Sequence, residues 1–184
     1  GTFPDKLKTS KITPIFKAGE DNDPENYRPI SILSVFNRIF EKLMYNRLIQ
    51  FIEHNKLLNN AQYGFRTGHS TTNAVLDIVN TIQNNMDNRL CSCAVFIDLQ
   101  KAFHSVNDYI LIKKLDCFGV RGCINNWFES YFSGRKQTTE IDGYISQKEI
   151  NSFGVPQGSV LGPLLFFLFI NDINKASNIL NFFI

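Results

Sequence analysis

Residues 93–118 read CAVFIDLQKAFHSVNDYILIKKLDCF, and the spacing of their apolar side chains changes halfway along. Residues 93–97 form a short apolar run of the kind that becomes a buried strand, and the run ends on Asp98. Residues 106–118 repeat their apolar side chains with helical spacing, and Gly119 supplies a stop. A strand followed closely by a helix predicts a mixed α+β fold in which Asp98 ends a strand, a position from which a carboxylate can point into a cleft.

Upstream of this stretch, the sequence predicts a hairpin and a long helix. Residues 12–17 and 27–31 have the composition of strands, and the polar residues between them suit a loop. Ser34 is a good helix N-cap, and the apolar residues after it recur three and four positions apart. The face of this helix that we expect to be buried comprises Phe36, Ile39, Phe40, Leu43, Met44, Leu48, Phe51 and Ile52.

A second helix is predicted after a loop at residues 59–70 that is punctuated by glycines. Either Ser70 or Thr71 can cap its N-terminus, because both hydroxyl side chains can accept a hydrogen bond from the first turn. The face that we expect this helix to bury comprises Ala74, Val75, Ile78, Val79, Ile82 and Met86.

The rest of the chain predicts a further helix, a hairpin, a buried helix and a last strand. The apolar run at residues 160–170 is far shorter than the roughly 20 residues that a membrane span needs, so we expect no membrane segment. The expected elements are a helix at 124–132 stopped by Gly134, strands within 135–150 about the turn pair Asp142-Gly143, a helix entered at Gly162-Pro163, and a strand at 180–184.

The composition is that of a folded domain or of a piece of one. Of the 184 residues, 43% are hydrophobic and 20% are charged, which excludes a disordered chain. The net charge of +2 is too small to show a polyanionic partner. Four lysines in the first 17 residues suit either phosphate contacts or an ordinary solvated surface; they are Lys6, Lys8, Lys11 and Lys17, against Asp5.

The four cysteines do not form a recognisable metal or disulfide pattern. Their spacing matches neither the C-x2-C pairs of zinc sites nor the framework of a small secreted domain. We therefore expect reduced cysteines with a structural role at Cys91, Cys93, Cys117 and Cys123.

Asp98 is the one residue that suggests chemistry from its position alone. A carboxylate at the end of a buried strand could hold a metal ion beside a phosphate substrate. The same carboxylate could equally cap the helix that follows the strand. One aspartate does not make a two-metal site, so spacing leaves both interpretations open.

Five phrases between residues 13 and 166 are more informative together than Asp98 is alone. They read TPIFKAGE, NYRPISIL, AQYGFRTGHST, IDLQKAFHSVN and GVPQGSVLGPLLF. In these phrases and in their order, the chain resembles the reverse transcriptases of non-LTR (LINE-like) retrotransposons. Their open reading frames are rich in PIFKxGD, NYRPISLL, QxGFRxGxST, DLSKAFDTV and GVPQGSxLGPLLF.

The resemblance implies a right-hand polymerase fold, with the fingers at about residues 1–90 and a partial palm with interleaved fingers helices at about 91–184. It implies an RNA-directed DNA polymerase that adds deoxynucleotides to a DNA primer on an RNA template by two-metal phosphoryl transfer, with two magnesium ions as cofactor. It further implies an intracellular protein, nuclear or cytoplasmic, with no membrane contact.

The resemblance also assigns roles around the metal ions and the sugar of the incoming nucleotide. The carboxylate of Asp98 and the backbone carbonyl of Leu99 correspond to metal ligands. Phe103, beside Ala102, corresponds to the ring under the sugar that excludes a 2′-hydroxyl. Packing into the core is the other interpretation of Phe103, because buried Phe is common in any fold.

The remaining roles concern phosphates, the nucleotide's backbone and the nucleic acid. Lys17 and Arg28 correspond to cations aimed at the β- and γ-phosphates, a task that suits the planar fork of Arg. An exposed Lys17 is also consistent with simple solvation. Gln157 and Gly158 correspond to the loop that touches the nucleotide, or else form a structural turn. Contacts to template or primer are expected for Gln62, Arg66 and Ser70.

Two features depart from the family pattern. His104 stands where the family usually has an aspartate, and we expect it to change hydrogen bonding beside the metal site without removing a ligand. The family's aromatic-Ala-Asp-Asp phrase would follow directly after Ile184, so we expect the 184-residue chain alone not to polymerise. The alternatives are a non-catalytic, nucleic-acid-binding remnant of a transposon and an aggregation-prone product with no selected role.

Overall fold

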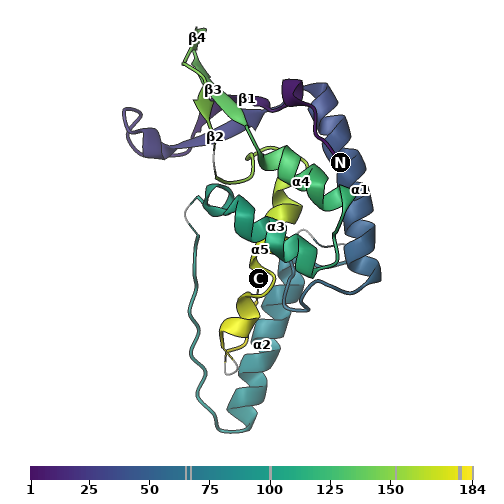
Figure 1. The fold of residues 1–184 in the computed structure, drawn as a ribbon. Coiled ribbons are helices and arrows are strands. Elements are labelled where there is room, and N and C mark those ends of the chain that lie inside the picture. Colours follow the sequence, from purple (N-terminus) through teal and green to yellow (C-terminus); the bar gives the residue numbers. More distant parts are fainter. Residues whose placement is uncertain (65, 67, 100, 152, 178–179, 184) are drawn as a thin grey trace.

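The computed structural model describes residues 1–64, 66, 68–99, 101–151, 153–177 and 180–183 (Figure 1). It contains a small mixed sheet and a set of helices packed beside it, so the predicted mixture of helices and strands is confirmed. The predicted hairpin is also present: β1 (Thr9–Phe16) pairs antiparallel with β2 (Tyr27–Ile32), which places Arg28 opposite Ile15. Its loop contains the short helix η2 (Pro24–Asn26).

The sheet is mixed, because it contains a parallel pair beside the antiparallel pairs. β3 (Lys136–Ile141) lies parallel to β1, and the strand order is β2-β1-β3-β4. A parallel pair is possible here because the two strands are joined by a long connection that contains helices. β4 (Tyr144–Ile145) and β5 (Glu149–Ile150) both pair antiparallel with β3.

The turn between β3 and β4 is the predicted Asp142-Gly143 pair. Their φ angles are +50° and +83°. Positive φ at both central residues is the conformation that two-residue hairpin turns require. The structure therefore confirms the predicted hairpin, with the turn at the expected position.

Helix α1 (Val35–His54) begins as predicted, because the Ser34 hydroxyl accepts a hydrogen bond from the Asn37 N–H at 3.2 Å. Its predicted buried face is largely wrong. The fully buried positions are Asn37, Glu41, Leu48 and Ile52, whereas the side chains of Phe36, Ile39, Phe40, Leu43 and Phe51 are exposed. Polar residues with internal partners orient the helix: the Asn37 amide, for example, donates to the Leu7 carbonyl oxygen at 2.8 Å.

Helix α2 (Thr71–Asp87) has the predicted cap, with the Ser70 hydroxyl accepting from the Asn73 N–H at 3.2 Å. None of its residues is buried, so the predicted burial of its apolar face is wrong. Figure 1 shows α2 extending away from the other helices. An amphipathic pattern shows that a helix has a face suited to burial, but it does not say which segment covers that face.

The predicted strand at residues 93–97 is absent. The chain there is extended without strand pairing, and the side chains of Val95, Phe96 and Ile97 are 80%, 88% and 74% exposed. Figure 1 shows this segment returning from α2 apart from the helices. A strand requires a neighbour that takes up its backbone hydrogen bonds, and the described residues place none beside it. Residues 180–183 are not a strand either, and Ile184 lies outside the described residues.

The core lies among α3 (Asp108–Cys117), α4 (Cys123–Phe132), α5 (Gly162–Ile170) and one side of α1. All three of these predicted helices are confirmed, and Pro163 occupies the first turn of α5 as expected. Among the described residues, no helix is long and apolar enough to cross a membrane. The four cysteines are unpaired and exposed. The fully buried core side chains include Phe3, Ile52, Leu111, Leu115, Phe128, Tyr131, Leu161, Leu165 and Leu168.

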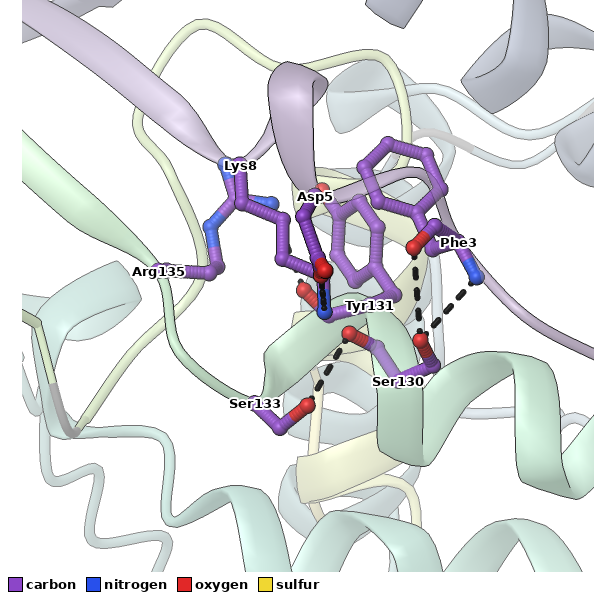
Figure 2. A network of polar contacts seen from close by, with 7 residues as sticks. All are labelled: Phe3, Asp5, Lys8, Ser130, Tyr131, Ser133 and Arg135. Carbon is purple, nitrogen blue, oxygen red and sulfur yellow. Dashed lines mark hydrogen bonds and ion pairs between the residues drawn. The ribbon is translucent and has the colours of Figure 1, made fainter.

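The N-terminal residues are fastened to α4 by the polar contacts shown in Figure 2. The Phe3 N–H donates to the Ser130 hydroxyl at 3.0 Å, while the ring of Phe3 stands edge-on to the ring of Tyr131 at 5.1 Å. The Lys8 ammonium lies 2.8 Å from the Asp5 carboxylate. These contacts fix the start of β1, and therefore the hairpin, relative to the helices.

Candidate functional site

The loop at residues 154–159, which carries the PQGS phrase, is hydrogen-bonded to β2. The N–H of Ser31 donates to the carbonyl oxygen of Gln157 at 2.7 Å. Gly158 has φ +104°, and a Cβ atom there would lie 3.1 Å from the Ser31 carbonyl oxygen. Only glycine accommodates both this φ angle and this close approach without strain. The 154–159 loop and the hairpin therefore form one continuous surface.

The same loop is hydrogen-bonded to η3 (Ala102–Ser105), which follows the Asp98 segment. The Gly154 N–H donates to the Val106 carbonyl oxygen, and the Val155 N–H donates to the Phe103 carbonyl oxygen, both at 2.8 Å. The loop thus contacts the hairpin on one side and η3 on the other. Segments that are far apart in sequence, and that carry three of the five family phrases, are brought together here.

The two cations predicted to bind phosphate lie on the hairpin, and both side chains are exposed. Lys17 directly follows β1, and its N–H donates to the Asn26 carbonyl oxygen at 2.8 Å. Arg28 lies on β2, three residues before the contact with the 154–159 loop. Neither forms an ion pair with any other described residue, so both charges are available to a ligand.

Phe103 is half-buried, and its ring packs against that of Phe166 on α5 with centroids 5.5 Å apart. Ala102 beside it is also half-buried. The contact with Phe166 is what we expect if Phe103 packs into the core. Part of the ring remains accessible, which a contact with the sugar of a nucleotide also requires. Lys101 adds a link to the hairpin loop, because its ammonium lies 3.6 Å from the Glu25 carboxylate.

The predicted metal ligands, Asp98 and Leu99, lie on the exposed extended segment. The described part of the chain contains no group of three His, Cys, Asp or Glu side chains that could hold a metal ion. The carboxylate of Asp98 is accessible and has the oxygen donors that a hard cation prefers. Two oxygens are too few for two ions, so Asp98 can be one ligand of a metal site but cannot form that site alone.

The residues predicted to contact template or primer have different environments. Gln62 is only 1% exposed, and neither polar atom of its side-chain amide has a hydrogen-bond partner among the described residues. Arg66 is half-buried and donates to the Asn59 carbonyl oxygen at 3.2 Å. Ser70 is exposed and caps α2. Arg66 and Ser70 are therefore accessible, whereas Gln62 lies beneath the loop surface.

His104, which replaces the family's usual aspartate, is half-buried in η3. Burial lowers the pKa of His104, and the positive charge of Lys101 lowers it further. The imidazole is consequently neutral at pH 7. It does not carry the negative charge that an aspartate would have at this position.

One residue near the 154–159 loop was not identified from the sequence. Glu41 is fully buried on α1, and its carboxylate accepts a hydrogen bond from the Val160 N–H at 2.7 Å, directly after the PQGS phrase. Burial raises the pKa of Glu41, while hydrogen bonds and the charge of Arg135 oppose the rise. The apolar periodicity of α1 gave no signal for this contact, because the partner lies 119 residues away in sequence.

The side chain of Asp108, at the start of α3, is a second perturbed carboxyl group. Burial raises the pKa of Asp108 to about 7, although the charge of Arg135 and the Gly154 N–H both lower it. Its Oδ1 atom has no hydrogen-bond partner among the described residues. The group lines a pocket of about 640 Å³, which contains none of the predicted site residues.

We predict that Asp108 makes the protein less stable as pH rises from about 4 to 7. The folded state holds the proton more tightly than the unfolded state, whose pKa is near 3.8. The contribution of Asp108 to stability is therefore fully present below about pH 4 and is lost as the pH rises through about 7. Because the side chain is partly exposed, we expect the loss to be about 1–2 kcal/mol. Urea unfolding at about pH 4 and pH 8 measures it.

Asp108→Asn should remove most of this pH dependence, and the part that remains belongs to groups such as Glu41, whose pKa is also raised. Asp87→Asn, at the exposed end of α2, is the matched control and should leave the dependence unchanged. If the free energy of unfolding falls as steeply with pH in the Asp108→Asn protein as in the native protein, Asp108 is not the group responsible.

Comparison with known proteins shows similarity to reverse transcriptases. Residues 15–179 match the family described as "Reverse transcriptase (RNA-dependent DNA polymerase)". The "Probable RNA-directed DNA polymerase from transposon BS" of Drosophila melanogaster is 37% identical over 175 residues, which are 93% of this chain and 19% of that protein.

Two further relatives extend this similarity. The "RNA-directed DNA polymerase from mobile element jockey" of Drosophila melanogaster is 34% identical over 94% of this chain and 19% of its own length. The "Retrovirus-related Pol polyprotein from type-1 retrotransposable element R2" of Popillia japonica is 28% identical over 90% of this chain and 23% of its own length. The chain thus spans about a fifth of the length of these relatives. With a family match from residue 15 to residue 179 and relatives aligned over nine tenths of its length, the chain belongs to the reverse transcriptase family, as its resemblance to the enzymes of non-LTR retrotransposons predicted.

Proposed function

We propose that this chain is the nucleotide-facing segment of an RNA-directed DNA polymerase of a non-LTR retrotransposon. In this proposal residues 1–90 are the fingers of a right-hand fold, and residues 91–184 are part of the palm with interleaved fingers helices. The observation that carries the proposal is the position of the 154–159 loop. It is hydrogen-bonded to β2 through Ser31 and to η3 through Phe103.

Each side chain at this junction has a task in holding a deoxynucleoside triphosphate. Arg28 and Lys17 bind the β- and γ-phosphates, since both are exposed cations that form no ion pair within the described part of the chain. The accessible part of Phe103, with Ala102, lies under the sugar and excludes a 2′-hydroxyl. Gln157 and Gly158 contact the sugar and its backbone, because the glycine lets the chain approach closely.

Asp98 and the carbonyl oxygen of Leu99 supply metal ligands in this proposal, and magnesium is the ion. Two magnesium ions, when bound in the complete enzyme, neutralise the charge that develops on the transferred phosphoryl group. This chain offers one carboxylate to that site, and other carboxylates of the polymerase complete it.

The partners that we propose are an RNA template and a DNA primer, in the nucleus or cytoplasm. Arg66, within the glycine-containing loop at residues 59–70, and Ser70, at the end of that loop, are accessible and suit contacts to nucleic-acid phosphates. Gln62 is buried, so this proposal gives its side chain no contact with the nucleic acid.

We predict that Arg28→Ala weakens the binding of a deoxynucleoside triphosphate about tenfold or more, and Lys17→Ala less. Loss of a charge-assisted, bidentate phosphate contact has an effect of this size. Isothermal titration of dATP with magnesium into the purified chain measures the affinities. Arg47→Ala is the matched control, because Arg47 is an exposed cation on α1. Equal affinities for the native, Arg28→Ala and Arg47→Ala proteins would contradict the phosphate role.

A non-catalytic remnant that binds nucleic acid is the second function, and His104 is the observation that favours it. The neutral imidazole removes a charge that the family usually has beside the metal site. Such a remnant would bind nucleic acid through its phosphates but would not extend a primer, even with the rest of a polymerase attached.

A further inference from the structure

A buried carboxylate joins the proposed nucleotide-binding loop to the core. Glu41 lies in the N-terminal half of α1 and is fully buried. One carboxylate oxygen, Oε1, accepts from the hydroxyl of Tyr131 at 2.7 Å, and the other, Oε2, accepts from the N–H of Val160 at 2.7 Å. Both oxygens are thus engaged, one by a core helix and one by the loop.

Val160 is the residue at which the PQGS turn ends. Inside the turn, the Ser159 hydroxyl donates to the Pro156 carbonyl oxygen at 2.8 Å and accepts from the Gly162 N–H at 2.9 Å. The hydrogen bonds of the Ser159 hydroxyl therefore hold the turn together internally. A contact at Val160, directly after the turn, then restrains the whole turn. Gln157 and Gly158 are the two residues inside this closed turn.

Tyr131, the other partner of Glu41, is packed tightly by its neighbours. Tyr131 is fully buried, its ring stacks on that of Trp127 at 5.4 Å, and the Arg135 guanidinium lies 4.7 Å above it. Figure 2 shows Arg135 reaching back to Tyr131, whose carbonyl oxygen accepts from the guanidinium at 3.4 Å. A ring packed in this way gives the hydroxyl one position, so the carboxylate that it contacts is also fixed.

We propose that Glu41 is the positioning residue of the nucleotide-binding loop: it acts through the Val160 N–H to hold Gln157 and Gly158 against β2. The role rests on the proposed nucleotide site, and Glu41 itself does not contact the nucleotide. The hydrogen bond from Ser31 to Gln157 holds the loop from the hairpin side, and Glu41 holds it from the core side.

The chemistry of the contact explains why a carboxylate suits this position. Two donors, the Tyr131 hydroxyl and the Val160 N–H, converge on one side chain, and a carboxylate can accept from both. A glutamine can still accept from Val160 through its oxygen, and its amino group can donate to the Tyr131 oxygen, which is both donor and acceptor. An alanine leaves both buried donors without a partner.

The experiment compares four variants of the 184-residue chain by hydrogen exchange of the backbone amides and by dATP titration with magnesium. In Glu41→Ala, we expect the hydrogen-bonded amides of Ser159 and Val160 to exchange about tenfold faster or more, while those of α3 and α5 change little. The affinity for dATP should fall in parallel. Glu41→Gln should behave almost as the native chain, and Glu53→Ala, at an exposed position of α1, is the matched control.

Tyr131→Phe is the fourth variant, and it tests the positioning role of Glu41 if Glu41→Ala does not fold. It keeps the Val160 contact but frees the carboxylate from its fixed partner, so the loop amides should again exchange faster than those of the helices. Unchanged loop exchange in both variants, or an even loss of protection across all helices, would overturn the positioning role. If the native chain does not bind dATP, the proposed nucleotide site fails, while the loop exchange still tests the restraint by Glu41.

Discussion

Replacing Gly154 by alanine is expected to lower the free energy of unfolding by about 2–5 kcal/mol. Gly154 has φ +86°, and a Cβ atom there would lie 2.7 Å from the Cα of His104 and 2.8 Å from the carbonyl oxygen of Phe103. Both are backbone atoms of η3, which cannot move aside as a flexible side chain could. The substitution therefore adds a steric clash to the strain of a positive φ angle.

Gly143→Ala is the matched control, because Gly143 has φ +83° and a Cβ atom there would meet nothing within 4 Å. This variant has the strain of a positive φ angle without a steric clash, so we expect it to lower the free energy of unfolding by about 1–2 kcal/mol. Urea unfolding followed by circular dichroism measures both losses. Equal losses in the two variants would show that η3 and the 154–159 loop are not packed as described.

The clash in Gly154→Ala also has a functional consequence. The hydrogen bonds from Gly154 to Val106 and from Val155 to Phe103 hold the loop against η3, and a displaced η3 would break both. We therefore expect the variant to bind dATP less tightly than Gly143→Ala does, when both are measured at a temperature where each is folded.

The local elements could be predicted from the sequence because their signals are local. Ser34 and Ser70 cap the helices that they were expected to cap, and Asp142-Gly143 forms the expected turn. A cap or a turn depends on side chains within a few residues of it, so a single segment of sequence contains the necessary information.

Burial could not be predicted in the same way, because it depends on which other segment covers a face. The run at 93–97 has the composition of a buried strand, yet its side chains are exposed where no described strand lies beside them. The apolar residues of α1 mark two overlapping faces, and the internal partners of Asn37 and Glu41 determine which of these faces is buried. Periodicity does not report such distant partners.

In the candidate site, too, some residues could be found from the sequence and others only from contacts between distant segments. The family phrases located Arg28, Phe103 and Gln157, and the structure brings their segments together through backbone hydrogen bonds. Glu41 lies outside these phrases, and its role follows only from contacts with Tyr131 and Val160, which are 90 and 119 residues away in sequence.

The largest effect on activity is expected for Asp98→Asn in a complete polymerase that contains this chain. We suggest inserting the chain in place of the matching segment of the jockey polymerase of Drosophila melanogaster, with which it aligns over 175 residues. Loss of a carboxylate that holds catalytic metal ions removes several kcal/mol of transition-state stabilisation, so primer extension should fall about 10³-fold or more. An amide oxygen remains, but the negative charge does not.

Asp87→Asn, at the exposed end of α2, is the matched control and should extend primers as the unmodified chimera does. Binding of the primed RNA template should be similar for all three proteins, because the proposed contacts to nucleic-acid phosphates, Arg66 and Ser70, are unchanged. This second measurement separates a loss of chemistry from a loss of folding.

Primer extension by this chimera on a primed RNA template is the most direct test of the proposed function. We predict that the chimera with the native chain incorporates deoxynucleotides in the presence of magnesium and that the Asp98→Asn chimera does not. A chimera that binds the primed template without extending it would favour the non-catalytic remnant. Extension that is equally fast with and without the Asp98 carboxylate would contradict the role of this segment in the polymerase site.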